Sequence, residues 1–361
     1  MAEQAVKTRP DKAEIAALLS LKSPDELKAL FARAYEVKKR YVGTRVWFRG
    51  LIELSNICSK DCFYCGIRSG NASVTRYTIS PDEVVKEARW CFEQGYGSIV
   101  LQAGERSDAA WTEIITDLIL KIKALSDGKL GITLSLGEQS EGVYRQWFEA
   151  GAHRYLLRIE ASNPTLYKQL HPADHSYDAR VECLRYLKKV GYQVGTGVMI
   201  GLPGQSVDDL ADDLLFFYDI DVDMIGMGPF IPHKDTPLGH LVPSFDPDEA
   251  IDMGLKMIAA CRIFLKDVNI ASTTALQALK DDGRELGLLA GANILMPNIT
   301  DTSFRDKYQL YEGKPCMDEN ASLCRGCLER RIQAIGETIA YNEWGDSVHF
   351  RTRTQTINQA D

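Results

Sequence analysis

The chain has 361 residues, of which 45% are hydrophobic and 25% are charged, a composition typical of a folded globular protein and not of a disordered one. Its 42 Lys and Arg residues against 50 Asp and Glu residues give a formal net charge of -8, which provides no overall attraction to nucleic acid. The N-terminal residues lack the apolar core of a secretory signal, and no apolar run reaches the roughly 20 residues that span a bilayer. We therefore expect a cytoplasmic protein with neither nucleic acid nor membrane as a partner.

Short β-rich runs alternate with longer amphipathic segments from residue 44 onward, which is the pattern of repeated β-α units. Between the runs, Ser80 and Glu83 form the capping box of one expected helix, and Gly191 ends another. Cys91, Cys183 and Cys261 fall inside expected helices and are interpreted as small buried residues. Eight runs are predicted to be strands, and they end at Asn56, Gly104, Gly137, Glu160, Gly201, Phe230, Leu276 and Asn298.

Eight such units within about 250 residues predict an α/β fold, a closed (β/α)8 barrel of the TIM type. An open doubly wound sheet is the alternative, but no G-x-G-x-x-G follows the first strand. We expect helices in residues 1–43 to pack outside the barrel, the barrel itself to span 44–300, and a tail, 301–361, to cross back over it. Catalytic residues of such a barrel lie at the C-terminal ends of its strands.

Three cysteines, Cys58, Cys62 and Cys65, follow the first predicted strand directly. A structural zinc site has four protein ligands, and a cluster of four irons normally takes four thiolates. With three thiolates one iron remains open, so the fourth ligand is expected to be a small molecule. A zinc site that recruits a histidine from far along the chain stays open as an alternative.

The CxxxCxxC spacing, with the aromatic Tyr64 before the last cysteine, resembles the signature of radical S-adenosylmethionine (SAM) enzymes. This resemblance implies a 4Fe-4S cluster on the three cysteines and SAM on the open iron. Ala103, Gly104 and Glu105 resemble the family turn that binds the amino group of the cofactor. Five further cofactor-binding positions, together with Tyr64, Gly104 and Glu105, follow from the same resemblance: Arg158, Glu160, Arg180, Met199 and Met224. A structural ion pair is the alternative for Arg158 and Glu160, and core packing is the alternative for the two methionines.

Longer segments make the resemblance more specific. Over about residues 50 to 330 the sequence resembles the HydE-type maturases of FeFe-hydrogenase. The segments include "LLRIEASNP", "DMIGMGPFIPHKDTPL" and "KYQLYEGKPC". The resemblance implies a small organometallic substrate, a cysteine-bound iron with carbon monoxide and cyanide, along with other maturases and an electron donor as partners. Polar side chains expected to bind that substrate are Thr133, Ser135, Thr273, Thr274, Arg284 and Tyr308. A local cap or turn role is the alternative for each of them.

The tail contains three more cysteines, Cys316, Cys324 and Cys327. Their spacing matches an accessory iron-sulfur motif of HydE-like proteins, which implies a second cluster of the 2Fe-2S or 4Fe-4S type. A zinc knuckle or free thiols are the alternatives.

Two other functions compete with the maturase hypothesis. One is a radical SAM enzyme of the methylornithine synthase or biotin synthase type, which shares the cysteine motif and the barrel. The other is a non-catalytic iron-sulfur scaffold, which does not account for Arg158, Glu160 and Arg180.

Overall fold

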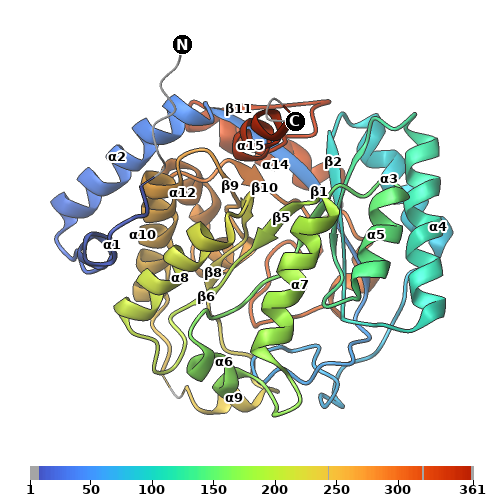
Figure 1. The fold of residues 1–361 in the computed structure, drawn as a ribbon, viewed down its shortest axis with the longest axis horizontal. Helices are drawn as coiled ribbons and strands as arrows, with labels where there is room; N and C mark the ends of the chain where they lie inside the picture. The colour runs from blue at the N-terminus through green and yellow to red at the C-terminus, as the bar shows by residue number, and fades with distance from the viewer. Residues whose placement is uncertain (1–7, 243, 319–320, 359–361) are drawn as a thin grey trace.

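The computed structural model describes residues 8–242, 244–318 and 321–358. Its centre is a barrel of eight parallel strands (Figure 1). These strands are β1 (Arg45–Ser55), β2 (Ser98–Ala103), β3 (Gly131–Ser135), β4 (Arg154–Leu156), β5 (Gln193–Thr196), β7 (Met224–Ile225), β9 (Asn269–Ile270) and β10 (Ile294–Leu295).

The strands pair in chain order, and the first strand also pairs with the last. The hydrogen-bonded order is β10-β1-β2-β3-β4-β5-β7-β9. An isolated bridge between Ala271 and Ile294 joins the two ends of this order, and the N–H of Ser272 donates to the carbonyl of Ile294 over 2.9 Å. The ring is therefore closed, and the predicted eight-stranded α/β barrel is confirmed.

Helices surround the ring and connect its strands. Ser80 caps the start of α3 as predicted by accepting from the N–H of Glu83, but in place of the second bond of a capping box Glu83 Oε2 accepts from the Ser80 hydroxyl. Gly191 ends α7 as predicted, with a φ of 112°. The helices are α1 (Lys12–Leu19), α2 (Pro24–Tyr41), α3 (Pro81–Glu93), α4 (Ala109–Leu125), α5 (Glu141–Glu149), α6 (Pro164–Leu170), α7 (Tyr177–Val190), α8 (Val207–Ile220), α9 (Pro237–His240), α10 (Pro247–Leu265), α11 (Thr274–Leu279), α12 (Gly283–Leu289), α13 (Thr302–Arg305), α14 (Ala321–Ala334) and α15 (Val348–Asn358).

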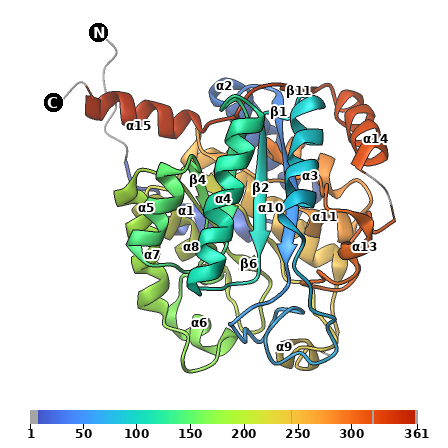
Figure 2. The same cartoon turned by 90° about the vertical axis from the view of Figure 1, so that its right-hand side faces the viewer.

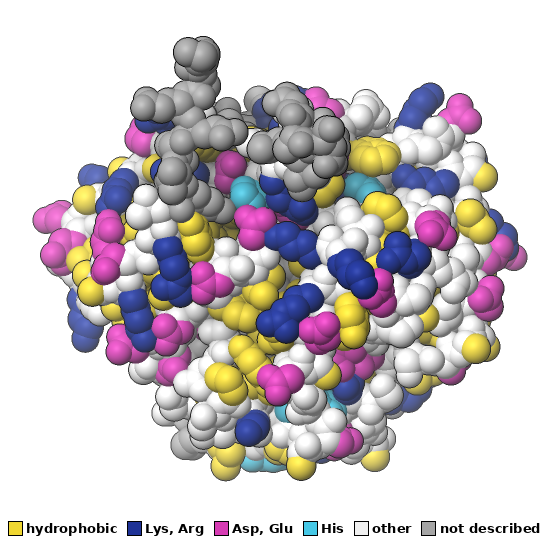
Figure 3. Space-filling view, in the orientation of Figure 1, with side chains coloured by type: hydrophobic (Ala, Val, Ile, Leu, Met, Phe, Trp, Pro, Cys, Tyr) yellow, Lys and Arg dark blue, Asp and Glu magenta, His cyan; other side chains and the backbone are white. Residues whose placement is uncertain are grey.

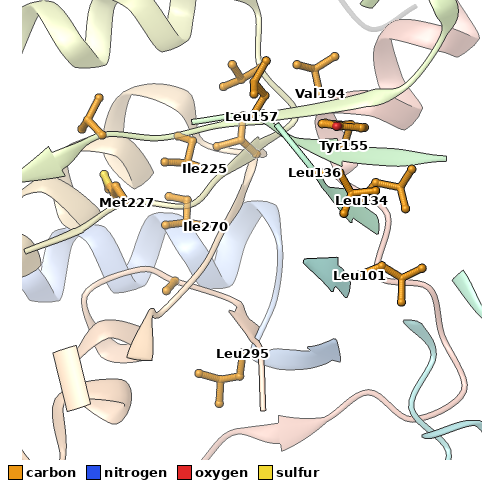
Figure 4. Close-up of a cluster of buried hydrophobic side chains, with 14 of the residues drawn as sticks. Leu101, Leu134, Leu136, Tyr155, Leu157, Val194, Ile225, Met227, Ile270 and Leu295 are labelled. Atoms are coloured by element: carbon orange, nitrogen blue, oxygen red, sulfur yellow. The ribbon is translucent and has the colours of Figure 1, made fainter. Parts of the chain in front are cut away.

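Apolar side chains of the strands pack against these helices. Successive strands contribute residues at matching register, such as Ile52, Leu101 and Leu134, each at most 1% exposed. Figure 4 shows this cluster continuing around the ring through Tyr155, Ile225 and Leu295. Because side chains alternate along a strand, polar residues such as Gln102 face the opposite way, into the barrel. Cys91, Cys183 and Cys261 are buried, as predicted.

One predicted strand is wrong in part. The run expected to end at Leu276 pairs only as far as Ala271, and Thr274–Leu279 is helix α11. Consecutive Thr residues favour a strand by propensity, but Thr273 occupies the N-cap position of the helix instead. Two other predicted runs each contain two short strands, because β6 (Met199–Ile200) and β8 (Gly228–Pro229) pair with one another outside the ring.

Described segments near each end of the chain pack on the barrel. Helix α1 packs on α8 and helix α2 on α10, while β11 (Thr338–Ile339) pairs with the beginning of β1. Figure 2 shows the strands pointing toward the end where α6 and α9 lie, with β11 and α15 at the opposite end. The tail thus covers the N-terminal end of the barrel, and the C-terminal end is left for a site.

On the face shown in Figure 3, acidic and basic side chains are interspersed, with hydrophobic side chains near the middle. A groove of about 860 Å³ runs there between α7 and α8. Within the described part of the chain, none of the helices has the length and apolar character required to cross a membrane.

Candidate functional site

The cysteine loop begins where β1 ends. Cys58, Cys62 and Cys65 are free thiols, each partly buried, and the backbone N–H of Glu105 donates to Cys58 Sγ over 3.3 Å. Burial raises the pKa of all three thiols, that of Cys62 to about 12, and the charges of the neighbouring thiols add to this at Cys65. Without a cation the three sulfurs therefore stay protonated at neutral pH.

Two glycines let the neighbouring turns approach this loop closely. A Cβ on Gly104 would lie 2.4 Å from the carbonyl oxygen of Ile57 and 2.8 Å from Cys58 Cβ. Gly137, with a φ of 77°, leaves room for the carboxylate of Glu105, which would lie 2.3 Å from a Cβ there. Glu105 Oε2 also accepts from the N–H of Glu138 over 2.9 Å. The turns after β2 and β3 are thus fixed to one another beside the cysteines.

Charged side chains from four segments meet around Glu105. Lys60 Nζ lies 3.3 Å from Glu105 and 2.9 Å from Glu138, and Arg180 Nε donates to Glu138 Oε1 over 2.5 Å. Burial raises the pKa of Glu105. At Glu138 burial acts in the same direction, but the positive charges of Arg180 and Lys60 outweigh it and lower the pKa. Glu138 is therefore held as a carboxylate between two cations.

Arg158 and Glu160 lie together at the end of the fourth β-α unit. Arg158 Nη2 is 2.9 Å from Glu160 Oε2, and Arg180 Nη1 donates to the carbonyl of Arg158 over 2.8 Å. Glu160 has a φ of 68°, a backbone conformation that is rare for residues other than Gly, Asn and Asp. Glu160 Oε2 is satisfied by the ion pair with Arg158, whereas Arg158 Nε is buried and has no hydrogen-bond partner among the described residues. Such an atom indicates a polar ligand at this position.

A second group of polar atoms lies around α11 and α12. Arg284, 3% exposed, donates from Nη2 to Thr274 Oγ1 over 3.0 Å, but its Nε and Nη1 and the hydroxyl of Thr273 have no hydrogen-bond partner among the described residues. Tyr311 is close enough to Arg284 and Arg158 for both charges to act on its pKa, although burial dominates and raises it. Arg158 Nη2 and the N–H of Gly228 both donate to the carbonyl of Val198, and a Cβ on Gly228 would lie 2.7 Å from Thr273 Oγ1. The Arg158–Glu160 pair and the Arg284 group are therefore neighbours.

The other predicted residues are distributed along the barrel. Tyr308 is buried and its hydroxyl accepts from Gln102 over 3.2 Å, and Ser135 is the last residue of β3. Thr133 accepts from Arg154, which in turn donates to the carbonyl of Trp344 in the tail. Thr133 therefore lies toward the end of the barrel that the tail covers.

The two methionines, Met199 and Met224, also lie at different ends of the barrel. Met199, in β6, belongs to a buried apolar cluster against which Tyr64 packs. The sulfur of Met224 instead accepts from Arg49 Nη1 over 3.0 Å, and Arg49 also donates to the tail carbonyl of Gly345. The structure therefore brings Met199, and not Met224, next to the cysteine loop.

The tail cysteines lie on the outside of the barrel. Cys324 and Cys327 are one turn apart in α14, whereas Cys316 precedes that helix and its sulfur accepts from Gln277 of α11 over 3.9 Å. Arg305 donates to the carbonyl of Cys316 over 2.7 Å. The accessory cluster stays a prediction.

Sequence reasoning missed several residues of the site. Lys60 lies inside the cysteine motif, and Glu138 follows β3 in the same way that Glu105 follows β2, which is the signal that would have identified it. Two histidines from the loop between α6 and α7 lie beside Cys62: His175 Nδ1 is 3.9 Å from Cys62 Sγ, and His171 Nε2 is 3.3 Å from the hydroxyl of Tyr64. The sequence left open that His153, His171 or His175 is recruited to the cysteines, but nothing in the spacing of these histidines pointed to Cys62.

The residues present fit a three-thiolate cluster with an amino acid as the fourth ligand. Three neighbouring thiols with raised pKa values become thiolates when a cationic metal replaces their protons. Beside them, Glu105 and Glu160 offer carboxylates to an ammonium group, and Arg158 and Arg180 offer guanidinium groups to a carboxylate.

Comparisons with known proteins agree with this geometry. Residues 52–217 match the model of the radical SAM superfamily. The chain is 44% identical over 318 residues, 88% of each chain, to the "[FeFe] hydrogenase maturase subunit HydE" of Thermotoga maritima. It is 29% identical to the biotin synthase of Gloeothece citriformis over 80% of each chain. The crystal structure of methylornithine synthase (PylB) superposes with a TM-score of 0.79 at 26% identity, covering 93% of this chain and 95% of that one. The chain is therefore a radical SAM enzyme and belongs to the family of the HydE maturase subunit.

Proposed function

We propose that this enzyme acts in the assembly of the diiron centre of FeFe-hydrogenase, on a cysteine-bound iron that carries carbon monoxide and cyanide. The observation that carries this proposal is the 44% identity to a HydE subunit over 88% of both chains. Support from the site comes from the unpaired polar atoms of Arg284 and Thr273, which suit an anionic complex.

Cys58, Cys62 and Cys65 would hold the 4Fe-4S cluster, and its open iron would take the amino acid part of SAM. The cluster and SAM, when bound, supply reductive cleavage of the sulfonium to a 5'-deoxyadenosyl radical. The residues of the chain orient the ligand for this step. Glu105 and Glu160 bind the ammonium group, and Arg158 and Arg180 bind the carboxylate.

Arg180 has a second task in this account. Its Nε is bound to Glu138, while its Nη1 holds the carbonyl of Arg158. One guanidinium thus connects the turn after β3 with the end of the fourth β-α unit, so both sides of the ligand keep a fixed separation. Met199, beside Tyr64, would contact the adenosyl group.

Substrate binding is assigned to the interior beyond SAM. Arg284, Thr273 and Thr274 would neutralise and orient the anionic complex, with Tyr308 and Ser135 as further polar groups. Thr133, which accepts from Arg154 near the tail, is not included in this proposal. Arg284 is already fixed by its hydrogen bond to Thr274, so little conformational entropy is lost when it binds the anion.

The partners we propose are other hydrogenase maturases and a reducing electron donor, and the compartment we propose is the cytoplasm. Cys316, Cys324 and Cys327 would bind an accessory iron-sulfur cluster. The division into residues 1–43, 44–300 and 301–361 is kept as a proposal for domain organisation.

Maturation of apo-hydrogenase in a defined mixture of purified maturases tests the function. Omission of this enzyme is expected to abolish hydrogen production, and adding the wild-type enzyme to restore it. A methylornithine synthase or biotin synthase activity instead predicts turnover of lysine or dethiobiotin and no restoration of hydrogenase.

A further inference from the structure

Two histidines and one cluster cysteine come together beside the cysteine loop. Cys62 Sγ, one ring nitrogen of His171 and one ring nitrogen of His175 all lie within 4.8 Å of one another, and these donor atoms are buried. Among residues 8–242, 244–318 and 321–358, no other three Cys, His, Asp or Glu side chains bring their ligand atoms this close together. One sulfur and two imidazole nitrogens are the donors that zinc and similar ions prefer.

His171 is already oriented as a ligand. Its Nδ1 lies 2.8 Å from the carbonyl oxygen of Tyr167, so Nδ1 carries the proton and Nε2 keeps its lone pair. The hydroxyl of Tyr64 therefore donates to Nε2 and would give up this bond when a metal takes the lone pair. The ring of Tyr167 stacks on the imidazole with centroids 4.1 Å apart. A histidine ligand whose second nitrogen donates to a backbone carbonyl is the usual arrangement around a protein-bound metal.

Backbone hydrogen bonds hold the segments that carry the three donors next to one another. The N–H of Phe63 donates to the carbonyl of Leu170 over 2.9 Å, which ties the cysteine loop to the end of α6. The N–H of His175 donates to the carbonyl of Pro172 over 3.0 Å and closes the turn that carries both histidines. His171 and His175 are 2% and 7% exposed, so packing holds both rings beside Cys62.

We propose that Cys62, His171 and His175 bind a single divalent ion of the zinc type when the iron-sulfur cluster is absent. Water would complete the tetrahedral coordination. Because Cys62 is also one of three cluster ligands, occupancy of this site and assembly of the cluster exclude one another. Zinc is therefore an inhibitor of cluster assembly in this enzyme. The two histidines are not cluster ligands, and they provide the affinity for zinc that causes this inhibition.

Cobalt(II) titration of the cluster-free full-length protein tests the site, because tetrahedral Co²⁺ bound to a thiolate shows a charge-transfer band and intense visible bands. We would use a Cys316→Ser/Cys327→Ser background, in which Cys324 is the one tail thiol left and the tail no longer offers several thiols to a metal. Four further variants are compared in it: Cys62→Ser, His171→Ala, His175→Ala and Cys65→Ser. Circular dichroism confirms that each variant is folded.

We expect one Co²⁺ per chain, displaced by equimolar Zn²⁺, with the charge-transfer band lost in Cys62→Ser and retained in Cys65→Ser. Each histidine variant should bind Co²⁺ about 10- to 100-fold more weakly. Retention of the band in Cys62→Ser, or unchanged affinity in both histidine variants, would overturn the proposal, since the metal would then be held by the other thiols.

Zinc should also slow reconstitution of the cluster. In the same background, one equivalent of Zn²⁺ added before iron and sulfide is expected to suppress the visible absorbance of the cluster, and His175→Ala should relieve this suppression. Equal suppression in both proteins would contradict the role of the histidine. Neither experiment involves turnover, so failure here is distinguishable from failure of the proposed function.

Discussion

The backbone N–H of Glu105 donates a hydrogen bond to Cys58 Sγ over 3.3 Å, so the turn after β2 holds the first residue of the cysteine loop. The same residue places its carboxylate beside Lys60 and against Gly137. One residue thus supports the cysteine loop through its backbone, and we propose that its side chain binds the cofactor.

Gly104→Ala should disrupt this contact, because the added Cβ would lie 2.4 Å from the carbonyl oxygen of Ile57. We expect a destabilisation of about 1 to 3 kcal/mol, the usual cost of overpacking, and a lower iron content after reconstitution. Urea unfolding and iron analysis measure the two effects. Gly142→Ala, in helix α5 with no atom closer than 3.8 Å to the new Cβ, is the matched control and should load iron normally. Equal iron contents in the two variants would argue against the close approach.

Glu160→Gln should weaken SAM binding. Loss of a charge-assisted hydrogen bond costs about 1.5 to 3 kcal/mol, which raises the dissociation constant roughly 10- to 150-fold. Equilibrium binding of SAM to the reconstituted, unreduced enzyme measures this change. Glu149→Gln, at an exposed helix position, should leave the constant unchanged, and a similar small change in both variants would remove Glu160 from the cofactor site.

Arg284→Met should separate cofactor cleavage from hydrogenase maturation. The substitution keeps bulk but removes the unpaired guanidinium nitrogens of Arg284, so the anionic substrate loses its counter-charge. We expect 5'-deoxyadenosine still to form while maturation falls at least about tenfold, with partial recovery in Arg284→Lys. Full maturation activity in Arg284→Met would contradict the assignment of this residue to the substrate.

Cys324→Ala should leave cofactor cleavage largely intact, because α14 lies outside the barrel and away from the cysteine loop. Deoxyadenosine formation per cluster measures the effect, and iron content reports whether the tail binds a second cluster. Loss of cleavage would mean that the tail cysteines are required for the reaction or for the fold.

Asp213 should make stability depend on pH. Burial raises its pKa to about 7, although Ser162 donates to it from its backbone N–H over 2.8 Å and opposes the shift. A carboxyl group whose pKa is higher in the folded state binds more protons there than in the unfolded chain, so stability falls as pH rises from about 4 to 7. Asp213→Asn should remove roughly 2 to 4 kcal/mol of this dependence, measured as urea midpoints of the cluster-free protein at pH 5 and pH 8. Parallel pH profiles for the two proteins would show that Asp213 does not titrate in this range.

How much the sequence predicts depends on whether the signal is local. Cys58, Cys62 and Cys65 share one short loop, so their spacing alone indicates a three-thiolate site, and Glu105 is recognisable because it follows a strand in a known turn. The barrel is predictable because its β-α units repeat.

Other features depend on tertiary contacts. Lys60 and Glu138 acquire their roles from a charge network with Arg180, a residue at least 42 positions away in the chain. His171 reaches the cysteine loop because a backbone hydrogen bond joins Phe63 to Leu170 at the end of α6. No sequence pattern in either segment predicts this contact. Thr273 and Thr274 read as strand by propensity, yet they begin α11, since Thr273 takes its N-cap position and Thr274 accepts from Arg284.

The formation of 5'-deoxyadenosine is the most direct test of the central claim. Wild-type and Cys62→Ala proteins would be reconstituted with iron and sulfide without oxygen, reduced with dithionite, and supplied with SAM. We expect 5'-deoxyadenosine from the wild-type protein and none from Cys62→Ala. A wild-type protein that contains a fully reduced cluster, yet neither binds nor cleaves SAM, would contradict the account and favour an iron-sulfur scaffold.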